Sequence, residues 1–239
     1  MLVFDLDGVL VESKTSMDDE VSVLLSRLLQ KMDVCIITGG SITQINKQVL
    51  PFLENCFYNN LYLMPLSGSE MWIWRLNKWI RFYFNDFSEE EIKKITSVTE
   101  KILPKYDKLW GDQLENRGGQ VTWSAYGQNA PLEVKKHYDP DGVKRKKYIK
   151  ILQEKLPEFE IRIGGTSSID ITQKNIDKAY GIQKLLSYKK INVDDIVFVG
   201  DSLFEGGNDY PVKKIGVKCY QVNSVLETKK LINNILEQG

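Results

Sequence analysis

Short apolar runs and amphipathic segments alternate near both ends of the chain. The apolar runs cover residues 1–4, 34–37, 61–64 and 196–200. Runs of this length are typical of strands that are buried on both faces of a parallel sheet. Residues 16–31 and 177–186 carry hydrophobic side chains at helical spacing. This order of strands and helices predicts an α/β domain, a Rossmann-like core built from both ends of the chain.

The middle of the chain has a different pattern. Residues 71–84 are rich in aromatic side chains and predict a hairpin, whereas residues 120–126 alternate as a half-buried strand does. Residues 88–103 and 143–156 predict amphipathic helices. These elements indicate an inserted α+β cap domain. We therefore expect a core of residues 1–66 and 171–239 and a cap of residues 67–170.

Composition narrows the classes of function. The 32 basic residues balance the 32 acidic ones, so no excess positive charge favours nucleic acid as a partner. No apolar run approaches the roughly 18 residues that a membrane span needs, and the N-terminus lacks a signal-peptide pattern. We expect a cytoplasmic protein without nucleic-acid or membrane partners. The single histidine excludes a two-histidine zinc site, and no CxxC pair occurs.

Polar residues follow three of the predicted buried strands. Asp5, Thr38 and Asp201 stand at the carboxyl ends of the runs at 1–4, 34–37 and 196–200. Because ligands bind beyond the carboxyl ends of parallel strands, we expect these three side chains to meet at one crevice.

The first of these strand ends carries Asp5-Leu6-Asp7-Gly8. Residues two apart in an extended segment share a face, so the two carboxylates of Asp5 and Asp7 lie together. Such a pair suits a nucleophile beside a general acid/base, or a metal site. A second DxDG at residues 139–142 follows no buried strand, and it predicts a turn and a helix cap instead.

The other strand ends suit a phosphate and a metal ion. Thr38 and Gly39 open a glycine-rich turn whose backbone amides are able to hold a phosphate. Asp201 and Asp209 offer the oxygen ligands that Mg²⁺ prefers. We therefore expect Mg²⁺ as the cofactor.

The charges of the candidate residues indicate that the site needs further cations. Asp5, Asp7, Asp201 and Asp209 carry −4, which Mg²⁺ and Lys178 reduce to −1 before an anionic phosphate arrives. A phosphate site needs further positive charge, for which the candidates are Arg117 and Lys14.

Four segments together resemble the motifs of the haloacid dehalogenase (HAD) superfamily of phosphotransferases. They are FDLDGVL, IITGG, Lys178 and GDSLFEGGND. The insert is similar to the type II caps of the sugar-phosphate branch. Within that branch, NRGGQVTWSA, GGTSSIDIT and IDKAYGI look most like eukaryotic-type phosphomannomutases and their bacterial relatives.

The resemblance implies roles in the core. Asp5 would become an aspartyl phosphate, and Asp7 would protonate the leaving oxygen and later deprotonate the acceptor. Thr38 and Lys178 would hold the phosphoryl oxygens. The expected metal ligands are Asp5, the Asp7 carbonyl, Asp201 and, in support, Asp209.

The resemblance also implies contacts with a sugar phosphate, the expected small-molecule partner. Two positions depart from the mutase pattern, because Lys14 and Gln128 stand where that pattern has arginine, and lysine is not a bidentate donor. The expected substrate-binding residues are Gly39, Lys14, Arg117, Gln128, Ser168, Asp170 and Asn208.

Three functions stay open at this point. The first is a Mg²⁺-dependent sugar-phosphate phosphatase, favoured because the cation lost at Gln128, with a lysine in place of an arginine at residue 14, weakens the binding of a second phosphate. The alternative is a phosphomannomutase or another phosphohexomutase, in which the sugar accepts the phosphoryl group. The second alternative is a non-catalytic phosphosugar-binding protein. We also expect that two copies form a homodimer through the cap.

Overall fold

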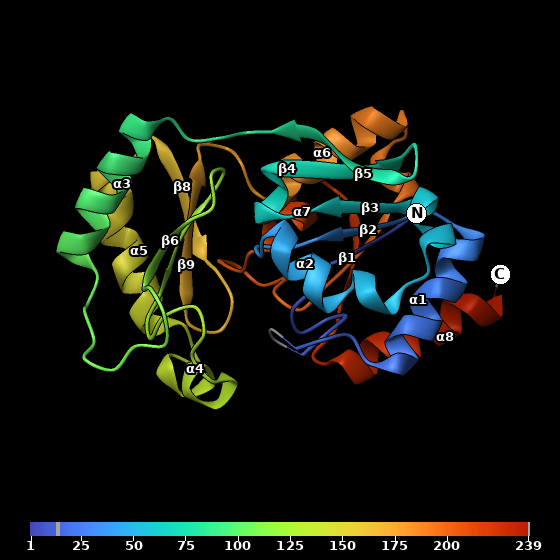
Figure 1. Cartoon of the computed structure of the whole chain (residues 1–239), viewed down its shortest axis with the longest axis horizontal. Helices are drawn as coiled ribbons and strands as arrows, with labels where there is room; N and C mark the ends of the chain where they lie inside the picture. Colours follow the sequence, from blue (N-terminus) through green and yellow to red (C-terminus); the bar gives the residue numbers. More distant parts are fainter. Residues whose placement is uncertain (13–14, 239) are drawn as a thin grey trace. The chain divides into compact units, whose positions relative to one another are not determined.

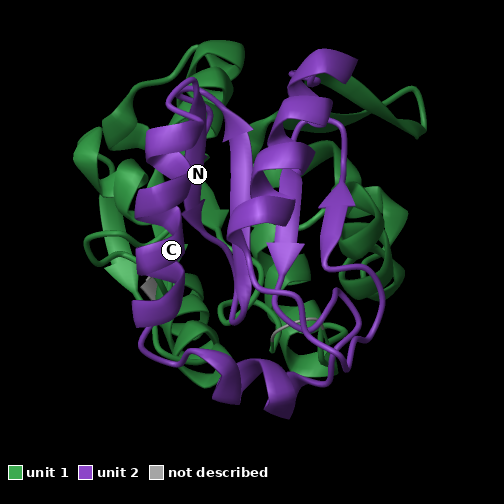
Figure 2. Cartoon of the chain, turned by 90° about the vertical axis from the view of Figure 1, so that its left-hand side faces the viewer, with its two compact units in different colours: residues 1–84, 178–239 green, residues 85–177 purple. Residues whose placement is uncertain are grey.

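The computed structural model describes residues 1–12 and 15–238, and it divides into two compact units. Unit 1 comprises Met1–Phe84 and Lys178–Gly239, and unit 2 comprises Asn85–Asp177 (Figure 2). Unit 1 has a mostly parallel sheet, and unit 2 has an antiparallel sheet of its own. The predicted fold class, an α/β core with an inserted α+β cap, is therefore confirmed. Among the described residues, no helix has the length and hydrophobicity to cross a bilayer.

The sheet of unit 1 contains seven strands in the order β11-β10-β1-β2-β3-β4-β5. The first five run parallel, and the last two add as an antiparallel hairpin. The strands are β1 (Leu2–Phe4), β2 (Val34–Ile37), β3 (Leu61–Met64), β4 (Glu70–Arg75), β5 (Lys78–Phe84), β10 (Val197–Gly200) and β11 (Lys218–Gln221).

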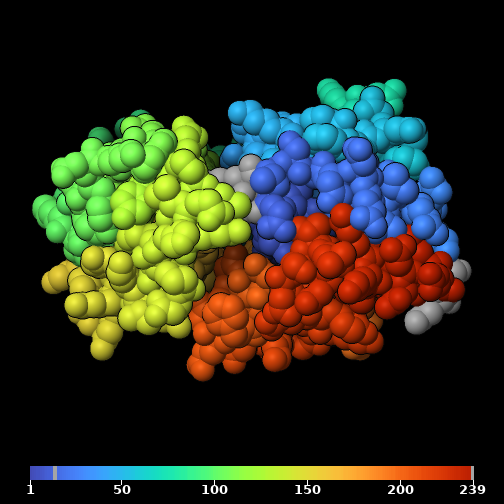
Figure 3. Space-filling model, turned by 90° about the horizontal axis from the view of Figure 1, so that it is seen from below, coloured from blue at the N-terminus to red at the C-terminus, as the bar shows by residue number. Residues whose placement is uncertain are grey.

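Helices cover both faces of this sheet because successive strand residues point to opposite sides. Leu2 and Phe4 join the hydrophobic cluster beneath α1 and α8, whereas Val3 joins the cluster beneath α6 and α7. α1 and α8 lie side by side in Figure 1, and their blue and red surfaces adjoin in Figure 3. The helices are α1 (Asp19–Lys31), α2 (Ile42–Gln48), α6 (Lys178–Lys189), α7 (Tyr210–Lys214) and α8 (Val225–Gln238), with short 3-10 turns η1 (Leu50–Phe52), η2 (Asn55–Asn60), η3 (Leu66–Gly68) and η4 (Val193–Asp195).

The aromatic hairpin β4–β5 belongs to unit 1, although we expected it in the cap. β4 pairs with β3, and the rings of Trp74 and Trp79 pack 5.5 Å apart against the core cluster. Burial of these large rings on the existing core explains the placement. The chain consequently passes from one unit to the other at residues 84/85 and 177/178, whereas we expected these boundaries near residues 66 and 171.

Unit 2 is built on a four-stranded antiparallel sheet in the order β6-β7-β9-β8. Its apolar face carries Trp123, Ile161 and Ile169, which pack against α3 and α5 (Figure 1). Its other face carries polar residues. The elements are α3 (Glu89–Ile102), β6 (Leu114–Asn116), β7 (Val121–Ser124), α4 (Leu132–Tyr138), α5 (Val143–Lys155), β8 (Phe159–Ile163) and β9 (Ser168–Gln173).

Candidate functional site

Three neighbouring parallel strands of unit 1 end at the same edge. Asp5 follows β1, Thr38 follows β2 and Asp201 follows β10. Phe4 is in register with Val199 of β10 and with Ile36 of β2, so the residues that follow these strands emerge together. The structure thus places the three predicted strand-end residues at one edge of the sheet.

Lys178 is the centre of a buried charge cluster at this edge. It opens α6 and is only 1% exposed. Its Nζ lies 2.7 Å from Asp5 Oδ1 and 2.6 Å from Asp209 Oδ1. Asp209 Oδ2 accepts a hydrogen bond from the backbone amide of Ser202 at 3.0 Å. Asp209 therefore fixes the lysine and the loop after β10 at the same time.

The cluster carries more negative than positive charge. Burial raises the pKa of the Asp5 carboxyl well above its usual value, although the positive charge of Lys178 acts in the opposite direction. The negative charges of Asp209 and Asp201 raise this pKa further. Burial also raises the pKa of Asp201, with Asp209 adding to the effect. Burial lowers the pKa of Lys178, but the charges of Asp209 and Asp5 outweigh this and keep it above the usual lysine value. The lysine stays a cation beside crowded carboxylates.

The same carboxylates fit a hard divalent cation. Oxygen atoms of Asp5, Asp201 and Asp209 lie within 4.8 Å of one another. Gly8 permits this approach, because a Cβ atom there would lie 2.5 Å from Asp201 Oδ2. Three carboxylates face one ammonium group, and a divalent cation would balance the remaining charge. The donor set therefore suits Mg²⁺.

Two further residues of the edge are held by local hydrogen bonds. Gln44, in the first turn of α2, donates from Nε2 to Asp7 Oδ2 at 2.9 Å. Thr38 is buried, and its Oγ1 accepts a hydrogen bond from the Gly40 amide at 3.0 Å. Sequence reasoning missed Gln44, for which the signal is its place in the helix that starts just after the Thr38 turn.

The polar face of the unit 2 sheet brings Ser168 and Asp170 together. The two residues stand two apart on β9, as expected for side chains that share a face. Both approach Gly164, where a Cβ atom would lie 2.7 Å from Asp170 Oδ2 and would also contact Ser168 Oγ. The glycine is thus required for the packing of this segment.

Arg117 and Gln128 also lie together in unit 2. Arg117 Nη2 is 2.7 Å from Glu115 Oε2 and 3.1 Å from Gln128 Oε1. Lys135, on α4, is buried and donates from Nζ to the Gln128 carbonyl at 2.8 Å. Sequence reasoning missed Lys135. The available signal was a lysine seven residues after Gln128, which the structure places on the short helix α4.

The remaining predicted residues are less informative. Gly39 is half-buried in the turn after β2, and Asn208 is half-buried just before Asp209. Lys14 lies outside the described residues. The core residues belong to unit 1 and the cap residues to unit 2.

The second DxDG, the control motif, behaves as a helix cap. Asp139 accepts from the backbone amides of Lys144 and Arg145, and Asp141 accepts from Val143. These contacts stabilise the start of α5. The prediction of a turn and cap is confirmed.

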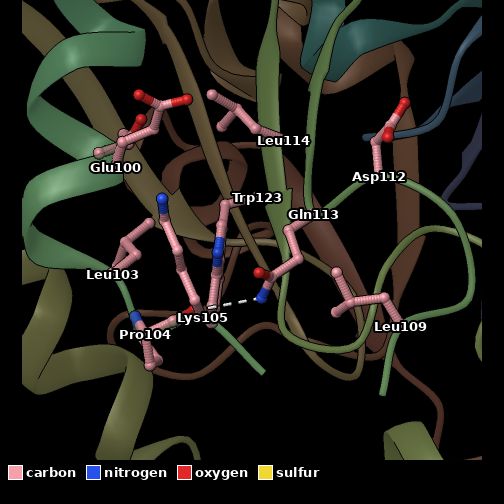
Figure 4. A pocket seen from close by; sticks show the side chains of 10 residues that line it. Glu100, Leu103, Pro104, Lys105, Leu109, Asp112, Gln113, Leu114 and Trp123 are labelled. Atoms are coloured by element: carbon pink, nitrogen blue, oxygen red, sulfur yellow. Dashed lines mark hydrogen bonds between the residues drawn. The ribbon is translucent and has the colours of Figure 1, made fainter. Parts of the chain in front are cut away.

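A separate cavity of about 270 Å³ lies within unit 2, between the end of α3, the following loop and β6 (Figure 4). Leu103, Leu109 and Trp123 form its apolar lining, and Gln113 at its edge donates to the Ala125 carbonyl at 2.6 Å. Of the predicted site residues that the structure describes, none lines it. This cavity is distinct from the polar face of the sheet.

Comparison with known proteins identifies the family. The model of the family described as eukaryotic phosphomannomutase matches residues 21–238. The chain belongs to this family. It is thus an enzyme of the phosphomannomutase family in the HAD superfamily, as the motifs had indicated.

Individual relatives agree with this assignment. The chain is 28% identical to the phosphomannomutase of Spinacia oleracea over 88% of its length and 84% of the relative's. It is 27% identical to the phosphomannomutase of Saccharomyces cerevisiae over 98% of this chain and 93% of the relative. Similarity to phosphomannomutases thus extends through both units.

Solved structures agree on the fold. The N-terminally truncated IMP-nucleotidase of Plasmodium falciparum aligns with a TM-score of 0.71 and 19% identity, over 100% of this chain and 70% of that one. SMU.1108c of Streptococcus mutans aligns with a TM-score of 0.69 and 17% identity, over 99% of this chain and 98% of that one.

Proposed function

We propose that this protein is a phosphohexomutase, which moves a phosphoryl group between O1 and O6 of a hexose. The observation that carries the proposal is the match to the phosphomannomutase family across both units. The buried cluster of Asp5, Lys178 and Asp209 supports it with groups suited to phosphoryl transfer. The comparisons favour this function over hydrolysis, which the sequence alone placed first.

Asp5 acts as the nucleophile. Its carboxylate oxygen attacks phosphorus, the bond from phosphorus to the sugar oxygen breaks, and Asp7 gives that oxygen a proton. In the return step Asp7 takes the proton of the other sugar hydroxyl, which attacks the phosphoryl group and frees Asp5. Gln44 holds Asp7 at 2.9 Å in both steps.

Two further residues stabilise the transferred group. Lys178, fixed by Asp5 and Asp209, offers its charge to the phosphoryl oxygens. The Thr38 oxygen accepts from the Gly40 amide, which leaves the hydroxyl hydrogen for a phosphoryl oxygen, and Gly39 presents its backbone beside it.

Asp5, Asp201 and Asp209, with the Asp7 carbonyl oxygen, would hold Mg²⁺. When bound, the ion supplies positive charge that offsets the repulsion between these carboxylates and an anionic phosphate.

The residues of unit 2 hold the end of the substrate that does not react. Arg117 and Lys135 supply two positive charges beside Gln128, so Lys135 offers a cation that Gln128 does not. Ser168 and Asp170 offer hydrogen bonds to sugar hydroxyls. Lys14 and Asn208 stay predicted contacts, and association of two copies through the cap stays a prediction that sedimentation velocity tests.

Hydrolysis is the second candidate. Gln128 is neutral, and Arg117 already pairs with Glu115, which weakens the grip of this face on a second phosphate. After the phosphoryl group has moved to Asp5, a hexose monophosphate that is weakly held by its remaining phosphate leaves before it takes the group back. Water then attacks the phosphoryl-Asp5 and releases inorganic phosphate.

One assay with two readouts separates these functions. The protein is incubated with Mg²⁺, mannose 1-phosphate and catalytic hexose 1,6-bisphosphate, while hexose 6-phosphate and inorganic phosphate are followed together. The proposal predicts hexose 6-phosphate with little phosphate. Phosphate as the main product would establish the phosphatase, and binding of the sugar phosphate without either product would establish the non-catalytic binding protein.

A further inference from the structure

A buried chain of hydrogen bonds leads to Asp170 from the neighbouring strand. Gln120 Nε2 donates to Thr122 Oγ1 at 2.9 Å, and Thr122 Oγ1 lies 2.9 Å from Asp170 Oδ1. All three side chains are buried. An ionised carboxylate only accepts, so the threonine must donate its hydroxyl hydrogen to Asp170.

Strand pairing and close packing agree with this orientation of Asp170. Thr122 and Asp170 are directly opposite each other in the β7–β9 ladder. The second carboxylate oxygen of Asp170 packs over Gly164. Arg162, opposite Asp170 on β8, directs its guanidinium to Glu160 and Asp177, each at 3.0 Å. The hydrogen bond from Thr122 therefore helps to fix Oδ1.

We infer that Thr122 is a positioning residue for sugar recognition. It holds Asp170 as an oriented, charged acceptor for hydroxyl groups of the hexose. Hydrogen bonds to a charged acceptor are among the stronger ones, and an acceptor fixed in advance loses little conformational freedom on binding. The inference rests on the proposed function and adds to it a residue that need not touch the substrate.

The test compares three variants in the hexose phosphate assay. Thr122→Val keeps the shape of the side chain but removes the hydroxyl, and we expect KM for the hexose phosphate to rise about tenfold with kcat within about twofold, as for loss of a hydrogen bond to a charged group. Thr122→Ser keeps the hydroxyl and restores KM. Thr99→Val is the matched control, because Thr99 is a buried threonine that donates to Ile95 within α3.

A double-mutant cycle with Asp170→Ala shows whether Thr122 acts through Asp170. We expect Thr122→Val to have no further effect on KM in the Asp170→Ala background. An equal rise in both backgrounds, or a KM that Thr122→Val leaves unchanged, would overturn the inference while the proposed function stands. A wild-type protein that turns over no hexose phosphate would overturn both.

Discussion

The charged groups of the core and those of the cap are held in different ways. In the core, Lys178 is almost fully buried, and two carboxylates lie within 2.7 Å of its ammonium group. On the polar face of the cap, Arg117 is half-buried and shares its hydrogen bonds with Glu115 and Gln128. In the core, the ends of the parallel strands and the start of α6 fix the positions of the charged groups. On the cap face, hydrogen bonds between individual side chains fix them.

Under the proposed function, this difference corresponds to a division between phosphoryl transfer in the core and substrate binding in the cap. A change in the core leaves a buried charge without its partner, which costs both stability and activity. Under the proposed function, we expect a change at an exposed or half-buried position of the cap face to alter how firmly the end of the substrate that does not react is held.

Asp5→Asn removes the nucleophile while it keeps the size of the side chain. We expect turnover to fall by a factor on the order of 10⁴ or more, with an unchanged circular dichroism spectrum. The matched control is Asp141→Asn in the second DxDG, which caps a helix and should keep full activity. Substantial turnover by Asp5→Asn would remove Asp5 from the mechanism.

Lys178→Met leaves Asp5 and Asp209 buried without their cation. We expect the free energy of unfolding to fall by about 3–5 kcal/mol in urea denaturation, since the partner of buried charges is lost. Lys184→Met on the same helix removes an exposed lysine and should stay within about 0.5 kcal/mol of the wild type. Equal stability of the two variants would contradict the role given to the buried cluster.

Mg²⁺ should stabilise the core through the carboxylates. At 100 times its dissociation constant, a ligand of the folded state adds about 2.7 kcal/mol to the free energy of unfolding. We expect this gain in thermal melts of the wild type, its loss with EDTA, and its absence in Asp201→Asn. A gain that survives in Asp201→Asn would place the ion elsewhere.

Gln128→Arg tests whether the cap face lacks a cation for the second phosphate. A second guanidinium beside Arg117 should lower KM for hexose 1,6-bisphosphate about tenfold, with a smaller share of turnovers that release phosphate. Asn129→Arg places the same charge on the exposed neighbouring residue and should change neither quantity. Identical effects of the two variants would mean that general charge, and not this position, holds the phosphate.

The sequence predicted the core better than the cap for physical reasons. Residues after parallel strands converge wherever the sheet forms, so Asp5, Thr38 and Asp201 were found from buried runs alone. Lys178 was a candidate from the charge balance alone, but its role as a phosphoryl-binding residue needed the family resemblance, because a lysine at a helix start has no such periodic signal. Its contacts with Asp5 and Asp209 join residues far apart in the chain, and only the structure shows them.

The local sequence pattern does not determine the boundary of the cap or the contacts within it. The alternation in β4 and β5 predicts a hairpin, but it does not say which sheet the hairpin extends. Lys135 reads as one basic residue on a charged helix, although it is buried against Gln128. The link from Thr122 to Asp170 spans 48 residues. Tertiary packing decides each of these.

A direct search for a phosphoryl group on Asp5 tests whether this residue is the nucleophile. The protein is incubated with Mg²⁺ and hexose 1,6-bisphosphate, quenched in acid and digested, and the peptide that contains Asp5 and Asp7 is fragmented in a mass spectrometer. We predict one phosphoryl group on Asp5, absent from Asp5→Asn. A phosphoryl group on another residue, or turnover without any phosphorylated peptide, would contradict the central claim that Asp5 of the buried core cluster carries the transferred group.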